Sequence, residues 1–130
     1  MSGEVALDTS IAIQFLNGEA TVVDRVLALS MVILPLPVVG ELLFGAENSG
    51  RSLQNLTKYL QFIDACTVLP MSRETARCYS QVRLSLKQKG RPIPENDVWI
   101  GAQALENGWT LVSRDGHFSY IDDITVVDWS

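Results

Sequence analysis

The sequence predicts an α/β fold in which helices flank a mostly parallel central sheet. Short apolar segments alternate with longer segments whose apolar residues recur at helical spacing, as in proteins built from strand–helix–strand units. The 130 residues are 47% hydrophobic and 19% charged, which is enough apolar side chain for one core and too little charge for a disordered chain. No repeat or linker divides them. We therefore expect residues 1–130 to form a single domain.

The first half of the chain predicts two strands and four helices. Asp8 follows a short apolar segment, Gly18 is placed to end a helix, and Pro35 ends a second apolar segment. Pro37 suits the first turn of a helix, because a proline there loses no intrahelical hydrogen bond. The expected strands cover residues 4–7 and 32–34, and the expected helices cover residues 10–17, 19–30, 37–47 and 51–63.

The second half predicts three more strands and two long helices. Ser72 is a favourable N-cap for a helix that Gly90 is placed to end. Pro92 and Pro94 force an extended connection into the next helix, which Gly108 ends. The expected strands cover residues 67–69, 110–112 and 124–127, and the expected helices cover residues 72–89 and 95–107.

Four acidic residues fall where such a fold would bring them together. Asp8 and Asp115 follow predicted strands, whereas Glu41 and Asp97 lie early in predicted helices. In a parallel sheet the carboxyl ends of the strands and the amino ends of the helices share one edge, where the active crevice of such folds lies. We therefore expect the four carboxylates to converge there, although more than 100 residues separate the first from the last.

Four neighbouring carboxylates predict a site for divalent cations. Like charges raise one another's pKa, and hard ions such as Mg²⁺ or Mn²⁺ relieve the repulsion through oxygen ligands. Two such ions about 3.5 to 4 Å apart can activate a water and stabilise the leaving oxygen of a phosphodiester. The same ions would neutralise the site, so that an acidic protein can still approach RNA there.

Each acid also has a structural interpretation. Asp8 can cap the following helix, Asp97 can stabilise a helix N-terminus, and Asp115 forms a common turn pair with Gly116. Glu41 differs, because an acid within an apolar helical segment needs a partner. Spacing alone leaves both the structural interpretation and the metal site open.

Four segments in order carry a more specific signal. They are VALDTS, VVGELLFGA, GRPIPENDVWIGAQA and TLVSRDGHFSYI, and they span nearly the whole chain. Together they resemble the PIN-domain ribonucleases, and most closely the VapC toxins of type II toxin–antitoxin pairs. The third segment and the ordered set are the specific part of this resemblance, because each other segment alone would match many unrelated proteins. The resemblance implies a PIN-like three-layer sandwich.

The resemblance also implies residue roles. Ser10 matches a small hydroxyl position that orients the first acid, Ser113 stands where the family commonly has threonine, and Asn96 lies beside the third acid. The three aspartates among the acids would bind the metal. The residues that the resemblance makes catalytic are Asp8, Glu41, Asp97 and Asp115.

The implied activity is endonucleolytic cleavage of RNA by two-metal hydrolysis, dependent on Mg²⁺ or Mn²⁺. The implied partners are the RNA substrate, a cognate antitoxin protein that inserts a segment near the acidic pocket, and a second copy of the chain in a homodimer. None of these partners can be read from the residues themselves.

The net charge of −5 excludes a simple basic nucleic-acid binder, because such proteins neutralise phosphates with Lys and Arg. Six of the ten basic residues nevertheless lie between Arg73 and Arg91. Four of them fall on one face of the predicted helix: Arg73, Arg77, Arg83 and Lys87. We hypothesise that Arg77, Arg83 and Lys87 contact RNA backbone; the alternative is an ordinary solvated helix face.

Three further residues are expected to be structural. His117 adjoins Phe118, which indicates a packing position, and two-metal hydrolysis needs no histidine; the alternatives are a general acid or a metal ligand. Cys66 and Cys78 are too few for a disulfide scaffold or a Cys-rich zinc site, and we interpret them as ordinary buried thiols.

The sequence shows no membrane or secretion signal. The segment MSGEVALDTS has neither a basic n-region nor a long apolar h-region. The longest apolar run, residues 31–39, contains two prolines and is far shorter than the roughly 20 residues of a membrane span. We therefore expect a cytoplasmic protein without membrane contact.

Two other functions compete with the ribonuclease. Phosphoryl transfer with Asp8 as nucleophile needs, in phosphatases, a second Asp two residues on, where this chain has Ser10. It also needs a Lys near a late strand, and none follows Lys89. The remaining alternative is a non-catalytic PIN-fold module that binds RNA or protein, against which the intact set of four acids argues.

Overall fold

The structure, a computed structural model, describes residues 4–129 and has the expected α/β architecture. Five short strands form one sheet in the order β3-β2-β1-β4-β5, and all four neighbouring pairs are parallel. The strands are β1 (Val5–Leu7), β2 (Ile33–Leu34), β3 (Thr67–Val68), β4 (Thr110–Val112) and β5 (Thr125–Val127). The predicted parallel sheet is therefore confirmed. Residues 1–3 and residue 130 lie outside the described residues. Residues 1–3 belong to the segment in which we expected no secretion signal.

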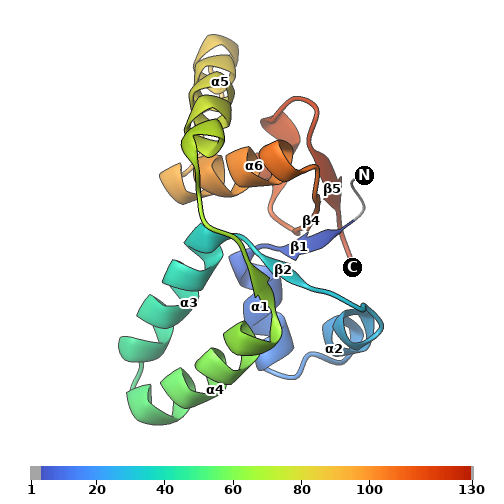
Figure 1. Cartoon of the computed structure of the whole chain (residues 1–130), viewed down its shortest axis with the longest axis vertical. Coiled ribbons are helices and arrows are strands. Elements are labelled where there is room, and N and C mark those ends of the chain that lie inside the picture. The colour runs from blue at the N-terminus through green and yellow to red at the C-terminus, as the bar shows by residue number, and fades with distance from the viewer. Residues whose placement is uncertain (1–3, 130) are drawn as a thin grey trace.

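Helices cover the sheet on both sides. Figure 1 shows α5 and α6 on one side of the strands and α1 and α2 on the other, with α3 packed beside α4. This is the three-layer arrangement that the resemblance implies. The helices are α1 (Thr9–Leu16), α2 (Ala20–Leu27), α3 (Leu36–Glu47), α4 (Ser52–Ala65), α5 (Arg73–Lys89) and α6 (Glu95–Asn107), followed by a short 3-10 helix, η1 (Gly116–Tyr120).

The element boundaries differ from the predicted ones by at most three residues, and two differences have clear causes. Helix α1 begins one residue early, because the Asp8 side chain accepts a hydrogen bond from the Ile11 N–H and makes Asp8 the N-cap. Helix α2 ends three residues early. There the Leu29 N–H bonds to the Val26 carbonyl at 3.0 Å, which closes a tighter turn. The 3-10 helix η1 was not predicted.

Capping follows the sequence signals in α5 and α6. The Ser72 hydroxyl accepts from the Glu74 N–H at 3.2 Å, while the Ser72 N–H donates to the Thr75 hydroxyl at 2.9 Å. Gly90 and Gly108 end their helices with φ of 67° and 68°, in the left-handed region that glycine adopts without strain. The ends of both helices are thus fixed by local chemistry.

The small residues of α6 let the loop that follows η1 pack closely on the helix. A Cβ atom on Gly101 would lie only 2.5 Å from Cδ1 of Ile121, whose side chain is itself buried. Ala102 and Ala104 are also buried in this helix. The close approach brings the η1 segment, and the acid that precedes it, against α6.

Gln103 is a fully buried amide in α6 that joins three elements. Its side-chain oxygen accepts from the Leu36 N–H at 2.8 Å, and its side-chain nitrogen donates to the Leu69 carbonyl at 3.1 Å. The Leu36 N–H belongs to the first turn of α3, where backbone N–H groups have no intrahelical partner. Gln103 therefore fixes the start of α3, the helix that carries Glu41.

The described residues also bear on the cysteines and on membrane contact. Cys66 and Cys78 are free thiols, and both are half-buried rather than fully buried. Burial raises the pKa of the Cys66 thiol to about 11, so the thiol is protonated at neutral pH.

No helix between residues 4 and 129 combines the length and the apolar character needed to cross a membrane.

We expect Gln103→Leu to lower the free energy of unfolding by roughly 1–3 kcal/mol, because it leaves the Leu36 N–H and the Leu69 carbonyl, both partly buried, without their partner. Chemical denaturation of the purified protein measures this loss. Gln54→Leu, at an exposed position of α4, is the matched control and should change stability by less than about 0.5 kcal/mol. Equal effects of the two substitutions would contradict the assigned role of Gln103.

Candidate active site

Asp8 stands at the carboxyl end of the central strand and is 4% exposed. One carboxylate oxygen accepts from the Ile11 N–H at 2.9 Å, and the other accepts from the Ser113 hydroxyl at 2.5 Å. The Asp8 N–H donates to the Val112 carbonyl of the neighbouring strand at 3.1 Å. Asp8 therefore caps α1, as its structural interpretation predicted. It is also hydrogen-bonded to β4 and to Ser113, which directly follows this strand on the way to Asp115.

The turn after β4 places the fourth acid. The Ser113 hydroxyl, which donates to Asp8, accepts in turn from the Asp115 N–H at 2.9 Å. The Asp115 side chain accepts from the N–H of His117 at 2.9 Å and caps η1. One serine hydroxyl thus connects the first and the fourth acid across more than 100 residues of sequence.

Asp97 lies in the first turn of α6, with its side chain 17% exposed. The Nδ1 atom of His117 is 3.3 Å from Oδ2 of Asp97 and 3.0 Å from Oδ1 of Asp115. The donor atoms of these three residues all lie within 4.8 Å of one another. The sequence elements therefore bring the third and fourth acids together, with an imidazole between them.

The expected packing position of His117 is wrong. Its side chain is 45% exposed and faces the acids, whereas the neighbouring Phe118 is completely buried in the core. The cause is η1, in which consecutive side chains point in different directions around a tight helix. The adjacent Phe118 anchors this turn and leaves the histidine at the site.

Glu41 has the partner that its apolar surroundings require. The Thr9 hydroxyl donates to Oε1 of Glu41 at 2.5 Å. Both residues line a groove of about 520 Å³, whose other lining residues are Pro37, Gly40, Phe44 and Asn96. Sequence reasoning missed Thr9; its place directly after Asp8, at the start of a helix, was the available signal.

Two predicted supporting residues lie at the edge of this region. The side chain of Ser10 is exposed, and Ser113 and the Ile11 N–H are the groups that orient the carboxylate of Asp8. Asn96 is also exposed and lines the groove beside Glu41.

The acids repel one another in a partly desolvated place. Burial raises the pKa of Asp8; hydrogen bonds from Ser113 and Ile11 lower it, and the charges of Asp115 and Glu41 raise it further. Burial is also the largest cause of the raised pKa of Asp97. The hydrogen bond from His117 opposes it, while Asp115 and Glu41 reinforce it. Asp8 and Asp97 therefore each lie within electrostatic reach of Asp115 and Glu41.

This donor set fits a divalent cation. It offers carboxylate oxygens and one imidazole nitrogen, which are ordinary ligands of such ions. Burial first, and then the neighbouring acids, raise the pKa of Asp8 and of Asp97, and a bound cation would favour the ionised form of both. Asp97 and Asp115 would hold an ion together, and Asp8 would complete the set from the end of β1.

The predicted basic face of α5 is exposed, and Thr75, Val82 and Leu86 on the other face are buried. Arg77 pairs with Glu74 at 3.1 Å and Arg83 with Glu95 at 3.6 Å. A hollow of about 320 Å³ lies between α5 and the start of α6. Its lining residues are Arg83, Leu86, Lys87, Pro92, Ile93, Glu95 and Val98. This hollow reaches the same helix end that carries Asp97.

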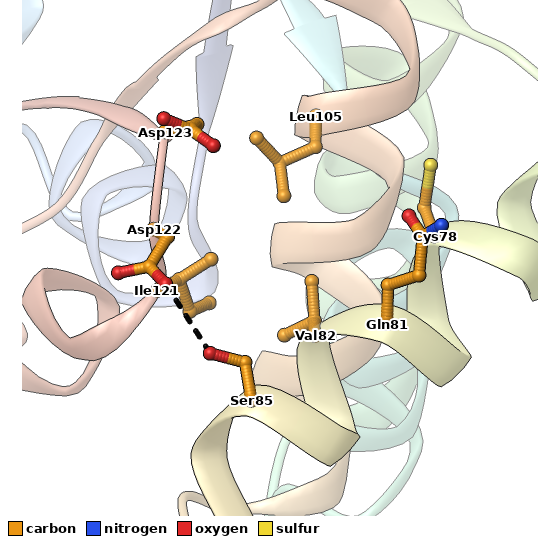
Figure 2. A pocket seen from close by; sticks show the side chains of 8 residues that line it. All are labelled: Cys78, Gln81, Val82, Ser85, Leu105, Ile121, Asp122 and Asp123. Atoms are coloured by element: carbon orange, nitrogen blue, oxygen red, sulfur yellow. Dashed lines mark hydrogen bonds between the residues drawn. The ribbon is translucent and has the colours of Figure 1, made fainter. Parts of the chain in front are cut away.

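A separate pocket of about 330 Å³ lies between α5, the end of α6 and the loop after η1 (Figure 2). Its lining includes Val82 and Ile121, and none of the four acids. The Ser85 hydroxyl donates to Asp122 at 3.3 Å across its rim, and Lys89 pairs with the same carboxylate at 2.5 Å. These contacts tie the loop after η1 to α5.

The PIN domain family model matches residues 5–124. The chain belongs to the PIN domain family. Among curated relatives, Ribonuclease VapC5 of Mycobacterium tuberculosis is 31% identical over 126 residues, which cover 94% of this chain and 90% of the relative. Ribonuclease VapC2 of Rickettsia felis is 26% identical over 133 residues, covering 95% and 96%.

Solved structures agree with this assignment. VapBC from Salmonella typhimurium bound to DNA contains a chain with a TM-score of 0.91 and 28% identity, and 98% of each chain is covered. VapBC2 from Rickettsia felis bound to a DNA fragment from its promoter gives a TM-score of 0.92 over the whole of both chains; at 24% identity it shows the shared fold. The chain is thus a VapC-like member of the PIN family.

We expect Asp97→Asn to make the metal-free protein more stable at neutral pH. Because folding raises the pKa of Asp97, there is a pH range in which the folded wild type keeps a proton on Asp97 that the unfolded chain has lost. The free energy of unfolding of the wild type therefore falls as pH rises from the ordinary Asp range through the raised pKa. Asparagine does not titrate and avoids this loss. Thermal unfolding in EDTA, from about pH 4 to pH 7.5, measures the difference, which should shrink at the acid end.

The control is Asp64→Asn, at an exposed position of α4, which should leave the dependence of stability on pH unchanged. A metal-free wild type that is more stable than Asp97→Asn at neutral pH would contradict the unfavourable burial and repulsion assigned to the Asp97 carboxylate.

Proposed function

We propose that this PIN-domain protein is a metal-dependent endoribonuclease that acts as the toxin of a toxin–antitoxin pair. The observation that carries the proposal is the arrangement of acids from β1, α3, α6 and the turn after β4 at one edge of a parallel sheet. The names of the curated relatives, which include ribonucleases and a tRNA(fMet)-specific endonuclease of Shigella flexneri 30% identical over 91 residues, support RNA as the substrate class.

In this proposal Asp8, Asp97 and Asp115 hold Mg²⁺ or Mn²⁺, and Glu41 is the fourth catalytic acid. When bound, the ions supply activation of water and stabilisation of the leaving oxygen of the phosphodiester. The chain's own contribution is orientation. Ser113 holds the carboxylate of Asp8 and the backbone of Asp115, so the two acids keep a fixed relation.

Three further residues have roles at the groove. Thr9 fixes the carboxylate of Glu41 through its 2.5 Å hydrogen bond. Asn96, which lines the same groove, has an exposed amide to offer a sugar or phosphate oxygen. Ser10 is exposed one position past Thr9, and we assign it to contact with the RNA substrate beside the groove rather than to the orientation of Asp8.

The proposed setting follows the relatives. The solved structures that the chain resembles are VapBC complexes, which supports a cognate antitoxin as the protein partner. Homodimer formation is proposed with it, since the resemblance implies a second copy of the chain. A single PIN domain over residues 1–130 and a cytoplasmic location are proposed from the length of the chain and from the absence of secretion and membrane signals in its sequence.

We expect expression of the protein alone in a bacterial host to arrest growth and to produce discrete new RNA 5′ ends. Asp97→Asn keeps the shape of the side chain and removes its charge, so cleavage should fall by at least about a hundredfold. Mapping 5′ ends across the transcriptome of cells expressing each protein measures the difference. The variant must be shown to be folded.

Identical 5′ ends from wild type and Asp97→Asn would contradict cleavage through this site. If neither protein produces new ends, Mn²⁺ is titrated into the pure wild type. Absence of binding there would favour the alternative, a non-catalytic PIN-fold module that binds RNA or protein.

We also propose that the basic face of α5 contacts RNA backbone through Arg77, Arg83 and Lys87. Two observations support this. The face is exposed, and its hollow leads toward the start of α6 beside Asp97. The Arg83 guanidinium lies 5.9 Å from the Tyr79 ring, which stacks on Trp99 with ring centroids 3.9 Å apart, so the cation is held in place.

We expect the triple change of Arg77, Arg83 and Lys87 to Gln to weaken binding of single-stranded RNA. For single-stranded RNA, each phosphate contact contributes roughly 0.7 to the slope of log binding constant against log salt concentration. If each of the three cations contacts one phosphate, their removal should make this slope shallower by about 2. Fluorescence anisotropy in the Asp97→Asn background measures binding without cleavage. The matched control changes Arg25, Arg51 and Lys58, in or beside α2 and α4; equal slopes for both triple variants would contradict the contact.

A further inference from the structure

The only histidine of the chain stands between two of the acids. Its Nδ1 atom lies 3.0 Å from Asp115 and 3.3 Å from Asp97, and its backbone N–H also donates to Asp115. The side chain is 45% exposed. His117 therefore contributes nothing to the core, and packing does not explain its position.

The spacing of the donor atoms suits one ion. Carboxylate oxygens and an imidazole nitrogen bind divalent metals at about 2.0 to 2.3 Å, so donors on opposite sides of an ion are separated by roughly 4 to 4.6 Å. The donor atoms of Asp97, Asp115 and His117 lie within 4.8 Å of each other. The three side chains thus need little rearrangement to share a cation.

The local fold holds the ring in place. Phe118 is fully buried and anchors η1, and the Asp115 carboxylate fixes the backbone of His117 at 2.9 Å. A ligand held in this way loses less conformational entropy on binding than a mobile surface histidine.

We propose that the His117 imidazole is a ligand of the ion held by Asp97 and Asp115, and that it biases this site toward first-row transition metals such as Mn²⁺ and away from Mg²⁺. This inference rests on the proposed metal-dependent function. Its chemical basis is that Mg²⁺ prefers oxygen donors and near-octahedral hydration, whereas imidazole nitrogen suits transition metals. A site made of carboxylates alone would have a weaker preference of this kind.

A second role would satisfy the same distances. His117 could donate a hydrogen bond that orients Asp97 and Asp115 without touching the metal. The substitution His117→Asn keeps an amide N–H donor close to the position of Nδ1 and removes the nitrogen ligand. The substitution therefore separates a ligand from a positioning residue.

The test uses the full chain without a histidine tag, stripped of metal by EDTA. Mn²⁺ is added to wild type, His117→Asn and Asp97→Asn, and pulsed electron paramagnetic resonance records nitrogen hyperfine coupling to the ion. Because the chain has one histidine, an imidazole coupling identifies His117. Calorimetry gives the Mn²⁺ and Mg²⁺ dissociation constants of the same three proteins, and circular dichroism checks their folding.

We expect imidazole coupling in wild type and its loss in His117→Asn. We also expect that variant to bind Mn²⁺ about ten- to a hundredfold more weakly, while its Mg²⁺ affinity changes less than about threefold. Mn²⁺ binding that needs Asp97 but shows no nitrogen coupling, or a His117→Asn variant with wild-type selectivity, would overturn the inference and leave the proposed function standing. A wild type that binds no Mn²⁺ would overturn both.

Discussion

The carboxylate of Asp8 is almost completely removed from solvent, yet both of its oxygens accept hydrogen bonds. A buried charge without such partners would be strongly unfavourable, so the surroundings of Asp8 must keep one arrangement. The Ile11 N–H ties it to the start of α1, and the Ser113 hydroxyl ties it to the end of β4. Since Ser113 also accepts from the backbone of Asp115, the position of the turn that carries the fourth acid follows from the burial of the first.

The acidic site is the part of this fold in which buried carboxylates repel one another. Burial and mutual repulsion raise the pKa values of Asp8 and Asp97, which means that the folded chain resists their full ionisation. Besides the hydrogen bonds from Ser113, Ile11 and His117, stabilising interactions also lie outside the acidic cluster. Gln103 satisfies the first turn of α3 and the end of the β3 segment, and the loop after η1 is bound to α5 through Lys89 and Asp122. These contacts hold the elements whose acids repel one another.

Most of the fold could be predicted from the sequence because its signals are local. Gly90 and Gly108 end their helices in the left-handed region, and Ser72 caps a helix, as short-range chemistry requires. The convergence of the acids could be predicted because the carboxyl ends of parallel strands and the amino ends of the following helices share one edge of the sheet. What sequence reasoning missed depends on side-chain direction: the turn of His117 toward the acids in η1 and the bond from Thr9 to Glu41. Gln103 was also missed, because a glutamine in a helix ordinarily faces solvent.

The connection from Asp8 to the turn after β4 joins the beginning of the chain to a segment more than 100 residues later. β1 lies at the centre of the sheet, and one of its two neighbours, β4, is synthesised only after α1 to α6 have all been made. A nascent chain that ends before residue 113 therefore lacks both the hydroxyl that orients Asp8 and the acid at position 115. The set of acids therefore cannot be complete, and Asp8 cannot be held by Ser113, until synthesis has passed residue 115.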